Sequence, residues 1–115
     1  MIVDSGATSN FNPYADIFVD YKNIQSKALL GDQSKSIDIL GKGNLDVIGE
    51  TYHVPSLTYG LISVADMDLK GYVTIFGGGK CTVINKYGIT ILTATLKNKL
   101  YFLDNICTNT MLDCV

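Results

Sequence analysis

Short apolar stretches separated by glycines recur along the whole chain, and they constrain its fold more than any other feature. They are rich in Ile, Val, Thr, Tyr and Phe, and many alternate with polar residues, which is typical of strands buried on one face. The stretches are "IFVDY", "SKALL", "SIDIL", "NLDVIG", "YHV", "YVTIF", "CTVIN", "ITILTATL" and "LYFL". Because they follow one another at hairpin spacing, they predict an all-β domain.

One segment favours a helix instead. The stretch "LISVADMDLKGY" (61–72) places Leu61, Val64 and Leu69 on one side, and Gly71 follows as a stop signal. No other part of the chain shows this spacing. We therefore expect one short helix in a protein otherwise built of strands.

Length, charge and cysteine content exclude several classes of protein. The 115 residues, 47% of them hydrophobic, suffice for one domain with a core and are too few for two. Nine Lys and Arg residues against eleven Asp and Glu, with no basic block, argue against a nucleic-acid partner. No apolar run approaches the roughly 18 residues of a membrane span, so we expect a soluble protein without a membrane partner. Cys81, Cys107 and Cys114 form no C-x-x-C pair, and we expect reduced intracellular thiols.

Several features that could bind a ligand have simpler interpretations. The run Gly77–Gly79 precedes the strand-like "KCTVIN", which predicts a hairpin loop, since a phosphate-binding loop needs a helix after it. His53 has no Cys or His partner at ligand spacing, so we expect a strand-end side chain and no metal. Asp66 and Asp68 are expected to be solvated carboxylates near the start of the helix.

The first residues of the chain combine a strand with an acidic turn. Ile2 and Val3 lead into Asp4, Ser5 and Gly6, which supply a carboxylate, a hydroxyl and a glycine in succession. Two carboxylates held about 3 Å apart share one proton, so that one acts as a base on water and the other as an acid toward a scissile carbonyl. By itself, however, an Asp-Ser-Gly tripeptide is usually only a turn.

The second carboxylate of such a pair must come from another copy of the chain. The sequence holds one Asp-Ser-Gly and no Asp-Thr-Gly, so an active enzyme requires a homodimer with a two-fold axis. In that dimer Gly6 lets the two backbones approach closely, and the Ser5 hydroxyl can hydrogen-bond the opposite turn.

Two further features follow Asp4 in a definite order. The stretch "KALLGDQSKSIDIL" has alternating runs around a Gly-Asp turn, which predicts a β-hairpin able to fold over a substrate as a flap. The stretch "GLISV" comes next, with two large apolar residues followed by a small one at the start of the expected helix.

In this order of features the sequence resembles the aspartic proteases of copia-type retrotransposons, within the retropepsin-like family. The matching stretches are "VDSGATSNF", "GDQSKSIDILGKGNL", "YHVPSLTYGLISVADMDLKGY" and "NKLYFL", which span residues 2–103. The resemblance implies a retropepsin-like closed β-barrel with a flap hairpin and one short helix over residues 1–103, and a tail over 104–115 toward the next polyprotein region. It also implies an aspartic endopeptidase without a cofactor, which cleaves the Gag-Pol polyprotein of its own element as a homodimer, in the cytoplasm or a virus-like particle.

The same resemblance implies the residues of the site. Asp4 is the catalytic carboxylate, and Ser5 and Gly6 form the active-site turn. The implied substrate-binding and flap residues are Ala7, Thr8, Leu30, Gly31, Asp32, Gln33, Leu61 and Ile62.

The sequence also departs from the pattern of retroviral relatives. Thr8 replaces an acidic residue two positions after the glycine, and Ser63-Val64 replaces a Gly-Arg or Gly-Asn pair, so any bracing of the site must come from hydroxyl hydrogen bonds. The strand that normally precedes the active-site strand is missing, which predicts a piece of a longer polypeptide and a weak dimer. Past Tyr72 the resemblance is to the linker toward the integrase, which makes the domain longer on its C-terminal side.

Two other functions stay open. A protease-like domain that no longer cuts can serve as an interaction module. The stretch "DSGATS" also fits the phosphodegron pattern D-S-G-x-x-S, although such a motif must be exposed and extended, whereas an apolar strand leads into this one. Dimerisation together with cleavage of a peptide from a polyprotein junction distinguishes the enzyme from the interaction module.

Overall fold

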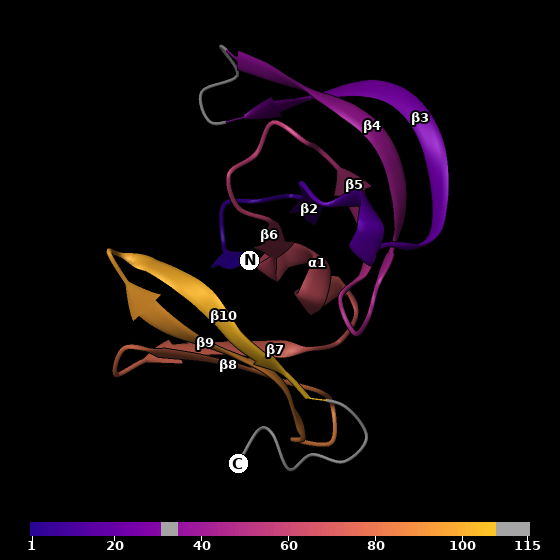
Figure 1. Ribbon diagram of the computed structural model, residues 1–115. Coiled ribbons are helices and arrows are strands. Elements are labelled where there is room, and N and C mark those ends of the chain that lie inside the picture. Colours follow the sequence, from indigo (N-terminus) through magenta and orange to yellow (C-terminus); the bar gives the residue numbers. More distant parts are fainter. Residues whose placement is uncertain (31–34, 108–115) are drawn as a thin grey trace.

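The computed structural model describes residues 1–30 and 35–107, in which strands dominate (Figure 1). Its helices are a short 3-10 helix η1 (Ala15–Ile17) and α1 (Val64–Leu69). Its strands are β1 (Ile2–Asp4), β2 (Phe11–Asn12), β3 (Val19–Leu30), β4 (Lys35–Leu45), β5 (Gly49–His53), β6 (Leu61–Ser63), β7 (Val73–Gly77), β8 (Lys80–Ile84), β9 (Thr90–Lys97) and β10 (Leu100–Ile106). The all-β prediction is confirmed.

The strands form one open sheet in the order β3-β4-β5-β2-β6-β1-β10-β9-β8-β7. A closed barrel needs its first and last strands to hydrogen-bond each other, but β3 and β7 lie at opposite edges of this order. In Figure 1 the hairpin of β3 and β4 curls over one side of the molecule, whereas β7 to β10 form a separate layer on the other side. The prediction of a closed barrel is therefore wrong for the described residues, because the C-terminal strands turn away from the curl instead of completing it.

The centre of the sheet brings distant parts of the sequence together. Strand β6 lies between β1 and β2: it runs parallel to β1, with Asp4 beside Ser63, and antiparallel to β2, with Phe11 beside Leu61. On its other edge β1 pairs with β10, with Ile2 beside Phe102. The acidic turn that follows β1 is therefore held by a strand from the middle of the chain and another from near its end.

The main core joins the two parts of the sheet. It holds Val3 and Ile62 from the central strands and Met67 from α1. The β4–β5 region adds Leu45 and Ile48. The C-terminal strands add Cys81, Val83, Leu92 and Ala94. A smaller core lies under the β3–β4 hairpin and contains Phe11, Ile39 and Val54. Because β8 and β9 contribute fully buried side chains to the main core, the segment after Tyr72 is an integral part of this fold.

The helix is shorter than the sequence predicts. Residues Leu61–Ser63 form strand β6, and α1 begins after Ser63, whose hydroxyl accepts a hydrogen bond from the Asp66 N–H as an N-cap. Met67 is the buried side chain of α1, whereas Leu69 is 88% exposed, so the expected position of Leu69 on the apolar side is wrong. The chain leaves the helix at Gly71, whose positive φ of 87° suits glycine, as the stop signal predicts.

Two tight turns connect the C-terminal strands. Gly78 and Gly79, with φ of 59° and 78°, link β7 to β8, which confirms the predicted hairpin loop. Asn98 and Lys99 adopt similar positive φ angles of 51° and 66° between β9 and β10, although no glycine marks this turn in the sequence.

The cysteines do not all behave as expected. Cys81 is free and buried, whereas Cys107 is disulfide-bonded, which contradicts the expectation of reduced thiols for this residue. Cys114 lies outside the described residues. Within residues 1–30 and 35–107, no helix is long and apolar enough to cross a membrane.

The β7–β8 turn generates a stability prediction. We expect Gly79→Ala to lower the free energy of unfolding by about 1–2 kcal/mol, because a side chain at positive φ strains the backbone. A Cβ at this position would meet nothing within 4 Å, so the loss reports backbone conformation alone. Gly77→Ala is the matched control, since its surroundings are equally open and its φ is not positive. Equal denaturation midpoints for the two variants would contradict this account.

Candidate active site

The acidic turn begins where β1 ends. Asp4 is half-buried, and its Oδ1 accepts a hydrogen bond of 2.8 Å from the Gly6 N–H, so the carboxylate folds back over its own turn. A Cβ at Gly6 would lie 3.3 Å from that oxygen, which is a tight contact that glycine avoids. Ser5 and Gly6 are exposed. The turn thus presents a positioned carboxylate at the molecular surface.

The hydroxyl of Ser63 braces this turn from below. Ser63 is fully buried, and its Oγ donates to the carbonyl oxygen of Ala7 at 2.7 Å while accepting from the Asp66 N–H at 3.0 Å. One hydroxyl therefore ties the acidic turn to the first turn of α1. The prediction of bracing by hydroxyl groups is confirmed at Ser63, whereas the Thr8 side chain is exposed.

Asn10 extends the brace, and it is not among the predicted site residues. This side chain is 1% exposed, and its Oδ1 accepts from the Ser63 N–H at 2.7 Å. Its Nδ2 donates to the Glu50 carbonyl oxygen at 3.0 Å and to Asp66 Oδ2 at 2.9 Å. A single sequence offers no signal that separates this asparagine from others, because its partners lie far along the chain.

The network ends in an ion pair on α1. Lys70 Nζ lies 2.7 Å from Asp66 Oδ2 and also donates to the Ile48 carbonyl oxygen. Asp66 is therefore a bonded, partly buried carboxylate, and its expected solvation is wrong; Asp68 is exposed as predicted. The lysine of the "LKGY" stretch thus anchors the helix to the β4–β5 connection.

The structure places the remaining candidate residues at different depths. Ala7 and Leu61 are half-buried, whereas Ile62 is fully buried in the main core and its side chain packs inward. The backbone of Leu30 ends β3 and pairs with Lys35 of β4, which confirms the predicted hairpin up to this point. Gly31, Asp32 and Gln33, and the side chain of Leu30, lie outside the described part of the chain.

In Figure 1 the end of β3 and the start of β4 lie on the same side of the molecule as the end of β1, at the left. The turn between β9 and β10 also lies on this side. The acidic turn therefore opens toward the side on which both hairpins end.

Comparison with protein families identifies the chain. A family model described as "Pol polyprotein, beta-barrel domain" matches residues 1–72. The chain belongs to this family. It is thus a region derived from a retroelement Pol polyprotein, and the match contains the acidic turn, Asn10 and Ser63. Neither the search of curated proteins nor that of solved structures gives a match.

His53 of this Pol domain packs between aromatic side chains. It is the last residue of β5, as predicted, and only 7% exposed. Its Nδ1 lies 2.7 Å from the Tyr21 hydroxyl, and the rings of Phe18 and His53 meet at 61° with centroids 5.8 Å apart. No cluster of three or more His, Cys, Asp or Glu side chains suited to a metal occurs within residues 1–30 and 35–107.

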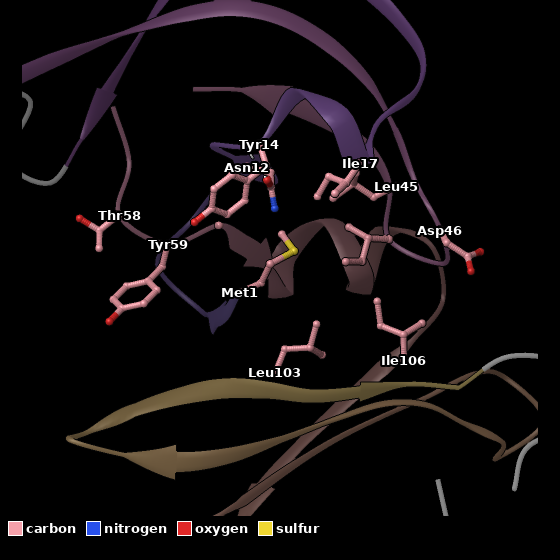
Figure 2. A pocket seen from close by; sticks show the side chains of 12 residues that line it. Met1, Asn12, Tyr14, Ile17, Leu45, Asp46, Thr58, Tyr59, Leu103 and Ile106 are labelled. Carbon is pink, nitrogen blue, oxygen red and sulfur yellow. Dashed lines mark hydrogen bonds between the residues drawn. The ribbon is translucent and has the colours of Figure 1, made fainter. Parts of the chain in front are cut away.

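A separate cavity lies away from the acidic turn. It measures about 580 Å³ and lies between β10 and the segments above it; Met1 reaches into its centre and Leu103 and Ile106 line its floor (Figure 2). Among the twelve lining residues the one acidic side chain, Asp46, points away from the centre in Figure 2. No carboxylate of these described lining residues is therefore directed into the centre of this cavity.

Cys81 is unsuited to act as a nucleophile. Its side chain is fully buried between β7 and β9, and burial raises the pKa of the Cys81 thiol to about 11. The thiolate is the reactive form of cysteine, and with this raised pKa little thiolate exists near neutral pH.

We expect iodoacetamide at pH 8 to leave Cys81 unmodified in the native protein and to alkylate it after unfolding in guanidinium, as read by mass spectrometry. Rapid alkylation under native conditions would contradict the buried position.

The Ser63 brace generates a second stability prediction. We expect Ser63→Ala to lower the free energy of unfolding by about 2 kcal/mol or more, because it removes a helix cap and leaves the Ala7 carbonyl oxygen without its donor. The control is Ser26→Ala, on the exposed β3–β4 hairpin, which should change stability by less than about 0.5 kcal/mol. Denaturant unfolding of both variants measures the difference, and equal effects would remove Ser63 from its bracing role.

Proposed function

We propose that this Pol domain is a retropepsin-type aspartic endopeptidase of a copia-type element, active as a homodimer with Asp4 as the catalytic residue of each subunit. The observation that carries the proposal is the half-buried Asp4 carboxylate, held by the Gly6 N–H on a turn that Ser63 braces. A carboxylate fixed at the surface by hydrogen bonds is pre-organised for catalysis, because little reorganisation is needed when a partner and substrate arrive.

The proposed chemistry divides acid and base roles between two Asp4 residues. The ionised carboxylate takes a proton from water as the water oxygen attacks the peptide carbonyl carbon, and the protonated carboxyl gives its proton to the carbonyl oxygen. The tetrahedral diol then collapses: the carboxyl that took the proton from water gives it to the leaving nitrogen, the other carboxylate takes a proton from a diol hydroxyl, and the C–N bond breaks. No metal or cofactor enters this sequence, and the rate should fall at both low and high pH.

Two features support a second copy: the single Asp-Ser-Gly of the sequence and the surface position of the turn. Each chain supplies one Asp-Ser-Gly turn, and the exposed Ser5 and Gly6 leave it accessible to a symmetry-related turn. An isologous two-fold contact places the same residues opposite each other, so it produces a carboxylate pair from a single type of chain.

The proposed substrate is an extended polypeptide. The long β3–β4 hairpin has the form of a flap, and closing it over the acidic turn would exclude water from the reaction. Because the domain derives from a Pol polyprotein, we place its cleavage sites in the Gag-Pol polyprotein of its own element.

The proposal is tested by replacing the carboxylate. We expect Asp4→Asn, which is nearly isosteric but cannot ionise, to abolish cleavage while the unfolding midpoint stays unchanged. Asp68→Asn is the matched control, because this exposed residue loses the same charge. Cleavage of a peptide library by the full chain at high concentration is measured by mass spectrometry.

Wild-type cleavage rates in Asp4→Asn would remove Asp4 from the mechanism. A wild-type chain that is dimeric by sedimentation and yet cleaves nothing would instead support the non-catalytic interaction module.

A further inference from the structure

We propose that the second copy packs against an apolar surface at the end of the C-terminal strands, formed by Phe76, Leu96, Leu100 and Tyr101. This inference rests on the proposed homodimer and assigns the surface that holds it together. It concerns residues that the proposed chemistry does not use.

The surface adjoins the acidic turn through strand pairing. Val3 pairs with Tyr101 across the antiparallel strands β1 and β10, so the next residue of β1, Asp4, lies next to Leu100. A hollow of about 420 Å³ is lined jointly by Asp4, Ser5, Phe76 and Leu100, among others. The proposed surface therefore begins at the catalytic turn itself.

Its members gather on one end of the C-terminal strands. The rings of Phe76 and Tyr101 meet edge to face with centroids 4.8 Å apart. Leu96 is the antiparallel partner of Tyr101, and directly opposed residues lie on the same face of a sheet. Leu100 precedes Tyr101 in β10 and pairs with Lys97, so it lies on the other face, and the apolar surface wraps around the end of the strands. Phe76, Leu96 and Leu100 are 40%, 41% and 43% exposed, although they are large and apolar. A concentration of exposed apolar side chains of this kind is typical of an interaction site.

Symmetry indicates that a second copy covers this surface. A two-fold axis that brings two Asp4 carboxylates to about 3 Å must pass between the two acidic turns. Whatever borders Asp4 then faces the partner, and Leu100 and Phe76 line the same hollow as Asp4.

The area that a stable dimer must bury also indicates that the contact includes this apolar surface. A stable dimer buries about 800 Å² on each partner, with the most apolar residues at the centre of the contact. The exposed part of the turn, Ser5 and Gly6, is two small residues and cannot supply such an area. The neighbouring apolar surface supplies the additional contact.

The test compares two exposed leucines. Leu96→Lys places like charges on both sides of the proposed contact, and Leu40→Lys is the matched control, because Leu40 is 46% exposed on β4. Sedimentation of the full chain from about 1 µM to 1 mM gives the dimer dissociation constant. We expect Leu96→Lys to raise it at least tenfold and Leu40→Lys to change it less than twofold, with unchanged unfolding midpoints. If Leu96→Lys destabilises the monomer, Leu100→Lys is the second variant.

The outcomes separate this inference from the proposed function. A dimer whose dissociation constant is unchanged in Leu96→Lys and Leu100→Lys overturns the inference and leaves the protease proposal standing. A dimer weakened by these variants, in a protein whose cleavage survives Asp4→Asn, supports the inference and overturns the proposed mechanism. A chain that stays monomeric at 1 mM, the top of the range that the dissociation constants of weak complexes span, overturns both.

Discussion

The buried hydroxyl of Ser63 is the contact on which the geometry of this domain depends most. It links the acidic turn, through the Ala7 carbonyl oxygen, to the Asp66 N–H in the first turn of α1, and Asn10 accepts a hydrogen bond from the Ser63 N–H. All of these groups are buried or partly buried, so each lost bond would leave a polar atom without a partner in a weakly solvated site. The position of Asp4 is therefore set by interactions well below the surface.

The pairing of β1 with both β6 and β10 joins two differently shaped parts of the domain in one main core. The family match ends at residue 72, yet Cys81, Val83, Leu92 and Ala94 pack in the same cluster as Val3 and Ile62. The C-terminal strands thus support the strand that carries Asp4. They also place apolar side chains beside it, which links the stability of the fold to the surface that we assign to the second copy.

Some features of the site could be predicted from the sequence and others could not. Thr8 in place of an acidic residue and Ser63-Val64 in place of a Gly-Arg or Gly-Asn pair implied hydroxyl bracing, and Ser63 provides it. Asn10 was missed because its partners Ser63 and Glu50 are 53 and 40 residues away. The helix was predicted too early because Leu61–Ser63 satisfies helical spacing, but β1 supplies these residues with strand hydrogen bonds instead. Tertiary pairing overrides a weak local preference of this kind.

The sequence by itself determined most local elements of this protein: the strand segments other than β2 and β6, the Gly78–Gly79 turn, the end of α1 at Gly71 and an acidic turn at Asp4. These follow from side-chain periodicity and from the φ angles that glycine permits, which act over a few residues. Only the tertiary structure decided that β6 enters between β1 and β2, that the sheet stays open, and that Phe76 and Leu100 share a hollow with Asp4. The pairing of β6 with β1 and β2, and of β1 with β10, joins segments fifty or more residues apart, where the choice of partner is set by the packing of the whole core and not by any one stretch of sequence.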